Sequence, residues 1–205
     1  MNITLPDGSI RKLESGSTGL DLANSIGPGL AKAAIAIEVN GSQKDLCDPI
    51  MEDSEVSIIT IDSDEGLEIM RHTLTAQVLA RAVKNLYPDT KLAIGPTITD
   101  GFYYDFEFKK PISTEDLEDI EKEMKKVIAT NSAITKSLHT KEDAIKIFKS
   151  EKEPYKESII EDSDQEDNFQ LYYQEDSKFV DLCRGPHLPN LKHIGSFKLT
   201  KLAGA

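Results

Sequence analysis

The segment Cys183-Arg184-Gly185-Pro186-His187 places a thiol and an imidazole four residues apart. The Gly-Pro pair between them excludes a helix, because proline disfavours helical geometry in the residue before it. A tight turn after a strand would instead bring both side chains towards one pocket. Such a pair could ligate a metal, act as nucleophile and base, or position a water. By spacing alone, an inert pair is the favoured interpretation.

The remaining cysteine and histidines do not complete a metal site. Cys47 and Cys183 lie far apart and form no CxxC pair, so the sequence predicts neither a disulfide framework nor a zinc ribbon. Zinc takes three or four protein ligands, and His72, His139 and His193 repeat no ligand spacing. We therefore expect no metal in this chain.

Four further residues could carry chemistry. Asp181 should point to the same face of its strand as Cys183, because side chains two residues apart share a face. Lys156 lies in a strongly acidic stretch, where a solvated surface lysine is the simpler interpretation. Tyr103 and Tyr104 face opposite sides of their strand, so one is expected in the core while the other can face a cleft.

The charge distribution limits the type of partner. The 205 residues carry a net charge of −12, which argues against binding nucleic acid by bulk electrostatics. From Cys183 to the end, however, there are no acidic residues, while Arg184 and three lysines are present. Local contact with a phosphate chain is therefore possible there. The sequence contains no apolar stretch of membrane-spanning length and no signal peptide, so we expect a cytoplasmic protein.

Residues 1–62 are predicted to form a small domain of strands with one helix. Ser17 or Thr18 can cap this helix, and Gly27-Pro28-Gly29 ends it. Later β-branched runs predict strands at residues 33–39 and 56–61. Two strands, a helix and further strands follow the order of a ubiquitin-like β-grasp.

Residues 66–205 are predicted to form a larger α+β domain. A long helix is expected from Leu67 to Pro88, with an apolar ridge at every fourth residue: Met70, Leu74, Val78, Ala82 and Leu86. The other expected elements are an extended segment at 102–108, a helix capped by Ser113 or Thr114, a short helix at 141–148, and a hairpin formed by 169–173 and 178–182.

Several motifs together resemble the editing domain of bacterial threonyl-tRNA synthetases. They are Leu67-Glu68-Ile69-Met70-Arg71-His72, Lys91-Leu92-Ala93-Ile94-Gly95-Pro96, Gly101-Phe102-Tyr103-Tyr104-Asp105 and Asp181-Leu182-Cys183-Arg184-Gly185-Pro186-His187. Residues 1–62, with Thr4-Leu5-Pro6-Asp7-Gly8, resemble the TGS domain that precedes it. The resemblance implies an N-terminal fragment of a larger ligase that attaches threonine to tRNA(Thr) with ATP.

The resemblance also implies a substrate and a set of site residues. The family's second site hydrolyses mischarged seryl-tRNA(Thr). Carried over residue by residue, the catalytic set is Cys183, His187, Lys156, Asp181 and His72. Tyr104, Gly95 and Pro96 would lie near the terminal adenosine, and Arg184, Thr73 and Gln77 are further candidates for binding substrate. We expect these groups to position and polarise a water. An acyl-enzyme on Cys183 is not expected, because the sequence names no helix-borne base for it.

The first helix departs from the family pattern of two histidines four residues apart. Aligned from upstream, His72 is the first histidine and Ala76 replaces the second; aligned back from Pro88, the two positions are Thr73 and Gln77. The sequence therefore carries one extra residue between these anchors. On an ideal helix the two alignments differ by about 100° of rotation, so both cannot face the pocket. The alternative function is thus a tRNA acceptor-arm binding module with weakened or lost editing.

The resemblance implies no cofactor in this chain, since ATP, magnesium and zinc belong to the catalytic core of the family. The expected partner is the acceptor end of tRNA(Thr), with no membrane contact. We expect the chain to be a monomer and the parent enzyme a homodimer.

Overall fold

The protein divides into two units in the computed structural model, which describes residues 1–204. Unit 1 contains residues 1–70 together with the turn at 185–189, and unit 2 contains residues 71–184 and the chain from residue 190 onwards. The turn that carries His187 therefore belongs with the N-terminal unit, which nothing in the linear sequence indicates.

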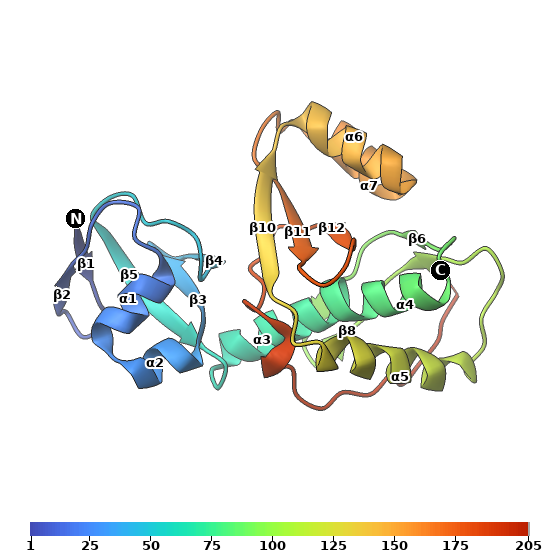
Figure 1. The fold of residues 1–205 in the computed structure, drawn as a ribbon, viewed down its shortest axis with the longest axis horizontal. Helices are drawn as coiled ribbons and strands as arrows, with labels where there is room; N and C mark the ends of the chain where they lie inside the picture. The colour runs from blue at the N-terminus through green and yellow to red at the C-terminus, as the bar shows by residue number, and fades with distance from the viewer. Residues whose placement is uncertain (205) are drawn as a thin grey trace. The chain divides into compact units, whose positions relative to one another are not determined.

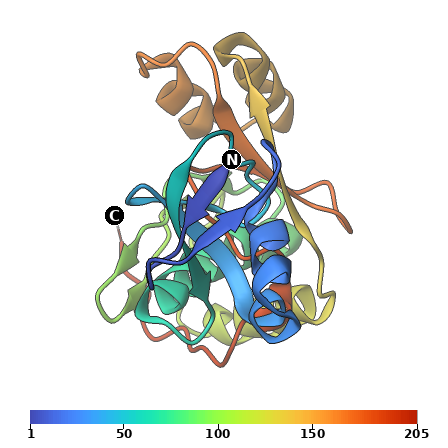
Figure 2. The same cartoon turned by 90° about the vertical axis from the view of Figure 1, so that its left-hand side faces the viewer.

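Unit 1 is built on a mixed five-stranded sheet with strand order β2-β1-β5-β3-β4. The strands are β1 (Asn2–Thr4), β2 (Ile10–Lys12), β3 (Ala34–Val39), β4 (Ser42–Asp45) and β5 (Ser54–Thr60). β1 and β5 are parallel, and the other neighbours are antiparallel. Helices α1 (Gly19–Ile26) and α2 (Pro28–Ala33) lie against the sheet (Figures 1 and 2). Leu22 and Ala23 of α1 pack with Ile3 and Ile37 of the sheet in the core of this unit.

The start of α1 confirms the predicted cap. The Thr18 hydroxyl accepts from the Asp21 amide while the Asp21 carboxylate accepts from the Thr18 amide, which is a capping box. Gly27 ends α1 as predicted. The chain does not leave the helical layer there, however, because Pro28 occupies the first position of α2, where its missing amide costs no hydrogen bond. The sequence analysis missed this second helix.

The long helix predicted after residue 67 runs from Asp64 to Leu86 but is not uniform. It consists of α3 (Asp64–Thr73), a π-helical segment η1 (Leu74–Leu79) and α4 (Ala80–Leu86). The predicted four-residue ridge is buried at Leu74, Val78 and Ala82, whereas Met70 is only partly buried. Leu86 is 38% exposed and Val83 is fully buried instead, because the wider π-helical turns change the rotation of every residue that follows them. In unit 2, α4 packs beside α5 (Asp116–Ala129).

Two short ribbons follow α4. β6 (Lys91–Leu92) pairs with β9 (Phe106–Glu107), and β7 (Thr97–Ile98) pairs with β8 (Gly101–Phe102). The segment that was predicted to be extended over 102–108 is thus split into two strands. Tyr104 lies between them and is buried, whereas Tyr103 is exposed, which confirms that the two rings take opposite sides.

A three-stranded antiparallel sheet with order β10-β11-β12 forms the rest of unit 2. Its strands are β10 (Ile134–His139), β11 (Phe169–Gln174) and β12 (Val180–Leu182), so the predicted hairpin is confirmed. Helices α6 (Lys141–Glu151) and α7 (Pro154–Glu161) form a pair beside it (Figure 1), and Phe148 and Ile160 pack on Leu171. A 3-10 turn, η2 (Leu191–His193), follows. The sequence analysis predicted neither β10 nor α7. Together the two units confirm the α+β class.

In the described part of the chain, residues 1–204, no helix has both the length and the apolar character needed to cross a membrane.

A buried polar network joins the long helix to β11. Nη1 of Arg81 donates to Oε1 of Gln174 at 2.7 Å and to Oδ1 of Asp176 at 2.8 Å, while Nη2 donates to Oδ2 of Asp176 at 2.9 Å. The hydrogen bonds from Arg81 lower the pKa of the Asp176 carboxyl from its ordinary value near 3.8 to about 2. This bidentate contact links α4 to the end of the sheet.

We predict that Asp176→Asn destabilises the protein at neutral pH and that the difference disappears in acid. A carboxyl whose pKa is lowered by folding contributes stability above its unfolded pKa, and this contribution is lost as the pH falls towards the folded value. The loss at pH 7 should be about 1 kcal/mol after allowance for solvent screening. Thermal unfolding from pH 7 to pH 2 measures it.

The control is Asp89→Asn, whose ion pair with Lys109 is exposed on both sides. This variant should unfold like the parent protein at every pH. If both variants lost the same stability at neutral pH, the contact of Asp176 with Arg81 would have no special role.

Candidate functional site

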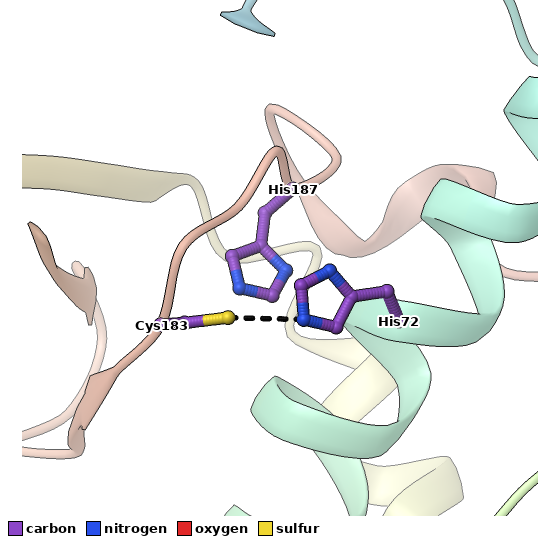
Figure 3. Close-up of side chains that lie close together, drawn as sticks. All are labelled: His72, Cys183 and His187. Carbon is purple, nitrogen blue, oxygen red and sulfur yellow. Dashed lines mark hydrogen bonds between the residues drawn. The ribbon is translucent and has the colours of Figure 1, made fainter. Parts of the chain in front are cut away.

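A thiol–imidazole pair lies in unit 2 where α3 meets the end of β12. Sγ of Cys183 is 2.9 Å from Nε2 of His72, and Figure 3 shows the sulfur pointing at that ring. Cys183 follows β12 directly, and its amide donates to the carbonyl of Gln170 on β11. Both side chains are partly exposed, so a substrate can reach them. The direction of the hydrogen bond depends on the tautomer of His72.

This contact removes the reason given for one expectation from the sequence, while the expectation itself stays a prediction. An acyl-enzyme on Cys183 was not expected, because no helix-borne base could be named. His72 is such a residue, and it contacts the thiol directly. The arrangement is therefore suited both to activating the thiol and to positioning a water between sulfur and imidazole.

His187 comes from the turn Gly185–Pro189, which groups with unit 1. In that unit its backbone amide donates to Oδ1 of Asp45 at 2.9 Å. The three side chains labelled in Figure 3 are of types that ligate zinc, but only two of them belong to unit 2. The role of His187 beside Cys183 and the expectation of a metal-free site both stay predictions.

A buried ion pair forms the second part of the site. Nζ of Lys156 is 2.7 Å from Oδ1 of Asp181, and the two side chains are only 5% and 2% exposed. Burial raises the pKa of the Asp181 carboxyl, while Lys156 and the backbone amide of Leu182 act in the opposite direction. The sequence analysis favoured a solvated surface lysine at position 156. That interpretation is wrong, because α7 turns Lys156 inwards against β12.

The position of Lys156 depends on how α7 begins. Glu153 precedes Pro154 at the start of the helix and is 3% exposed. Its carboxylate accepts from Nζ of Lys84 at 2.6 Å and from the amide of Leu92 at 2.8 Å. These two bonds tie the first turn of α7 to α4 and β6. Lys156 is thereby fixed, although the acidic stretch around it shows no sign of this in the sequence.

Tyr104 connects the ion pair with the thiol. Its ring lies 5.8 Å from Nζ of Lys156 and stacks on Phe106 with a centroid separation of 4.6 Å. Its hydroxyl is buried and accepts or donates no hydrogen bond within residues 1–204. Burial, and then the nearby Asp181 and Cys183, raise the pKa of Tyr104 well above its ordinary value. The phenol therefore stays protonated and keeps a donor that no group within residues 1–204 accepts from.

Gly95 allows this ring to occupy its place. A Cβ at position 95 would lie 2.2 Å from the Tyr104 ring and 2.8 Å from Cγ2 of Thr75 on the long helix. The glycine thus permits a close approach of helix, loop and ring. Its neighbour Pro96 is exposed.

The other predicted binding residues are not collected at the site in the same way. Thr73 and Gln77 are fully buried in the long helix, and Arg184 is exposed. Oε1 of Gln77 accepts from Nε2 of Gln174 at 3.2 Å. Their binding roles stay predictions. Of the two helix alignments left open by the sequence, the structure takes the one in which His72 faces Cys183.

Two regions of the chain match known domain families. Residues 1–60 match the TGS domain, which is ubiquitin-like, and residues 170–204 match the second additional domain of threonyl- and alanyl-tRNA synthetases. The matches define the class of protein as an aminoacyl-tRNA synthetase region with an editing-related domain.

The chain is also similar to individual synthetases that are threonine–tRNA ligases. The chain is 49% identical over all 205 residues to a threonine–tRNA ligase of Francisella philomiragia, and 47% identical to one of Acetivibrio thermocellus. It spans 32% of the length of each of these curated relatives. Over its whole length the chain is similar to the N-terminal regions of threonine–tRNA ligases, as the motifs predicted.

We predict that Gly95→Ala destabilises unit 2 by about 1–3 kcal/mol, the usual cost of overpacking a tight site. The added methyl must displace either the Tyr104 ring or the long helix. Thermal unfolding followed by tyrosine fluorescence checks both the stability and the ring environment.

Gly101→Ala is the matched control, because a Cβ there meets no heavy atom within 4 Å. It should leave both signals unchanged. Equal stability of the two variants would show that the contact at Gly95 is not restrictive.

Proposed function

We propose that this chain hydrolyses the ester of mischarged seryl-tRNA(Thr), which is post-transfer editing. The observation that carries the proposal is the thiol–imidazole pair of Cys183 and His72 next to the buried pair of Lys156 and Asp181 within one unit. The match to the editing-related domain supports it.

The chemical need follows from the size of the substrates. Serine lacks only one methyl group of threonine, which is worth about 1–3 kcal/mol in a binding pocket. A synthetic site alone therefore rejects serine poorly, and a second site that admits only the smaller product improves accuracy. The attachment of threonine with ATP belongs to the proposed parent enzyme.

The reaction breaks the bond between the seryl carbonyl carbon and a ribose oxygen. In the proposed step a water held by His72 and Cys183 adds to the carbonyl carbon and loses a proton to the imidazole. The imidazolium then returns this proton to the ribose oxygen, which leaves as a hydroxyl group while the carbonyl re-forms as the acid of serine. Lys156 supplies positive charge for the developing oxyanion, and the Tyr104 hydroxyl donates to an oxygen of the substrate. No cofactor takes part in this scheme.

The alternative function is a binding module for the tRNA acceptor arm without turnover. One observation favours it: the helix offers the single imidazole of His72, and Gln77 is engaged by Gln174 instead of a second histidine. A glutamine can donate and accept hydrogen bonds but cannot act as an acid or base at neutral pH.

We predict that the chain deacylates Ser-tRNA(Thr) and spares Thr-tRNA(Thr). Cys183→Ala and Lys156→Met should each lower the rate, the latter by about 10²-fold as expected for loss of an electrostatic donor. Release of labelled serine measures both. Lys156→Met alone leaves the buried Asp181 carboxylate without its partner, which is destabilising. The double variant Lys156→Met, Asp181→Asn removes both charges and is therefore measured alongside.

Cys47→Ala and Lys149→Ala are matched controls, since both residues are exposed and Cys47 lies in unit 1. They should retain the parental rate. Rates equal to buffer for every protein would refute editing, and salt-sensitive binding of tRNA without turnover would support the binding module.

A further inference from the structure

We propose that Gln174 is a positioning residue for the site: it holds the π-helical segment Leu74–Leu79, and this segment sets the rotation of His72 towards Cys183. The proposal deepens the editing function and gives the extra residue of the long helix a structural role.

The π-helical segment separates two parts of the helix that must each face a fixed direction. Within it the amide of Ala80 donates to the carbonyl of Thr75, an i→i+5 bond in place of i→i+4. Downstream, α4 is fixed because Ala80, Ala82 and Val83 are fully buried in the core of unit 2. If the same residues formed a regular α-helix, His72 would be rotated by about 100° relative to α4. The segment therefore absorbs the extra residue while His72 keeps its contact with Cys183.

Gln174 binds the backbone of this segment. Its Nε2 donates to the carbonyl of Gln77 at 2.8 Å and to Oε1 of Gln77 at 3.2 Å. Where i→i+5 bonding changes back to i→i+4 bonding, the helix has one amide fewer than it has carbonyls, and buried carbonyls need a partner. The side-chain amide of Gln174 supplies an additional donor to this segment, at the carbonyl of Gln77.

The orientation of the Gln174 amide is fixed by Arg81. A guanidinium can only donate, so the oxygen of Gln174 must face Arg81, at 2.7 Å, and the nitrogen must face Gln77. Asp176 in turn holds Arg81 through two bonds. Gln174 is 1% exposed, so water does not compete for these contacts.

The same strand also holds the other half of the site. On β11, Tyr172 pairs with Asp181 and Leu171 pairs with Leu182 of β12, and the carbonyl of Gln170 accepts from the amide of Cys183. Gln174 at the end of β11 thus ties the helix of His72 to the sheet that carries Cys183. It touches neither reacting group, and it acts through the backbone of the helix.

The test uses Gln174→Glu in a Cys47→Ala background, where Cys183 is the single thiol. Glutamate keeps an acceptor for Arg81 but loses both donors towards Gln77. The variant therefore keeps the bond to Arg81 and removes only the bonds to the π-helical segment. Two signals are read: the rate of Cys183 alkylation by iodoacetamide, and the long-range ¹H–¹⁵N spectrum of the His72 imidazole. Neither signal needs tRNA.

We expect Gln174→Glu to change the alkylation rate by about fivefold, the equivalent of one hydrogen bond. The change should have the same sign as the change that His72→Ala causes. We also expect it to move the His72 imidazole signals. Asn85→Ala, which removes a side-chain bond of α4 to Glu123 but none of the π-helical segment, should leave both unchanged. Deletion of Ala76 removes the extra residue, so the segment can close into a regular α-helix whose backbone no longer needs Gln174. This deletion variant should keep the parental alkylation rate, and adding Gln174→Glu to it should change nothing; the pair decides the matter if the glutamate variant alone does not fold.

Parental alkylation and imidazole signals in a folded Gln174→Glu protein would overturn the proposal. So would an alkylation rate like that of His72→Ala after the Ala76 deletion. Deacylation of Ser-tRNA(Thr) is measured in parallel. Altered thiol and imidazole signals without deacylation by any protein would sink the editing function alone, whereas deacylation by the parent with unaltered signals would sink the positioning role alone.

Discussion

The buried pair of Lys156 and Asp181 is the interaction on which the arrangement of unit 2 depends. Two charges with side chains only 5% and 2% exposed can stay ionised only if they face each other. The pair therefore requires α7 to meet β12 at one position, and the carboxylate of Glu153 holds the first turn of α7 there. An ion pair so deeply buried contributes little net stability compared with apolar packing; under the proposed function its role is to present charge to the substrate.

The site combines this rigid charged part with a more accessible part. Lys156, Asp181 and Tyr104 are buried, whereas His72 and Cys183 are partly open to solvent. Electrostatic groups act most strongly where water is excluded, while the groups that handle a water or a proton must be reached by it. The division fits ester hydrolysis, in which the oxyanion forms in the interior and the nucleophile arrives from outside.

The sequence predicted elements whose signals are local. The Thr18 cap, the hairpin that leads to Cys183 and the opposite sides taken by Tyr103 and Tyr104 follow from capping chemistry and from alternation. Helix α7 was missed, because its acidic composition resembles a solvated loop and its inward side is defined only by Asp181 on a distant strand. Pro154 after Glu153 was the available signal, since proline is favoured at the first position of a helix. The grouping of His187 with unit 1 depends on Asp45, 142 residues away, and has no local signal.

The register of the long helix shows most clearly where sequence reasoning stops. An ideal helix made the two alignments mutually exclusive, because one residue rotates every later side chain by about 100°. The protein meets both requirements by leaving ideal geometry: His72 follows the upstream alignment and α4 packs as the downstream alignment requires. The widened turns need partners for their backbone, and these come from Gln174, 97 residues away in sequence. An insertion that looked like damage to the pocket is thus accommodated by a tertiary hydrogen bond. The functional question then moves from whether His72 faces Cys183 to whether one imidazole is sufficient for hydrolysis.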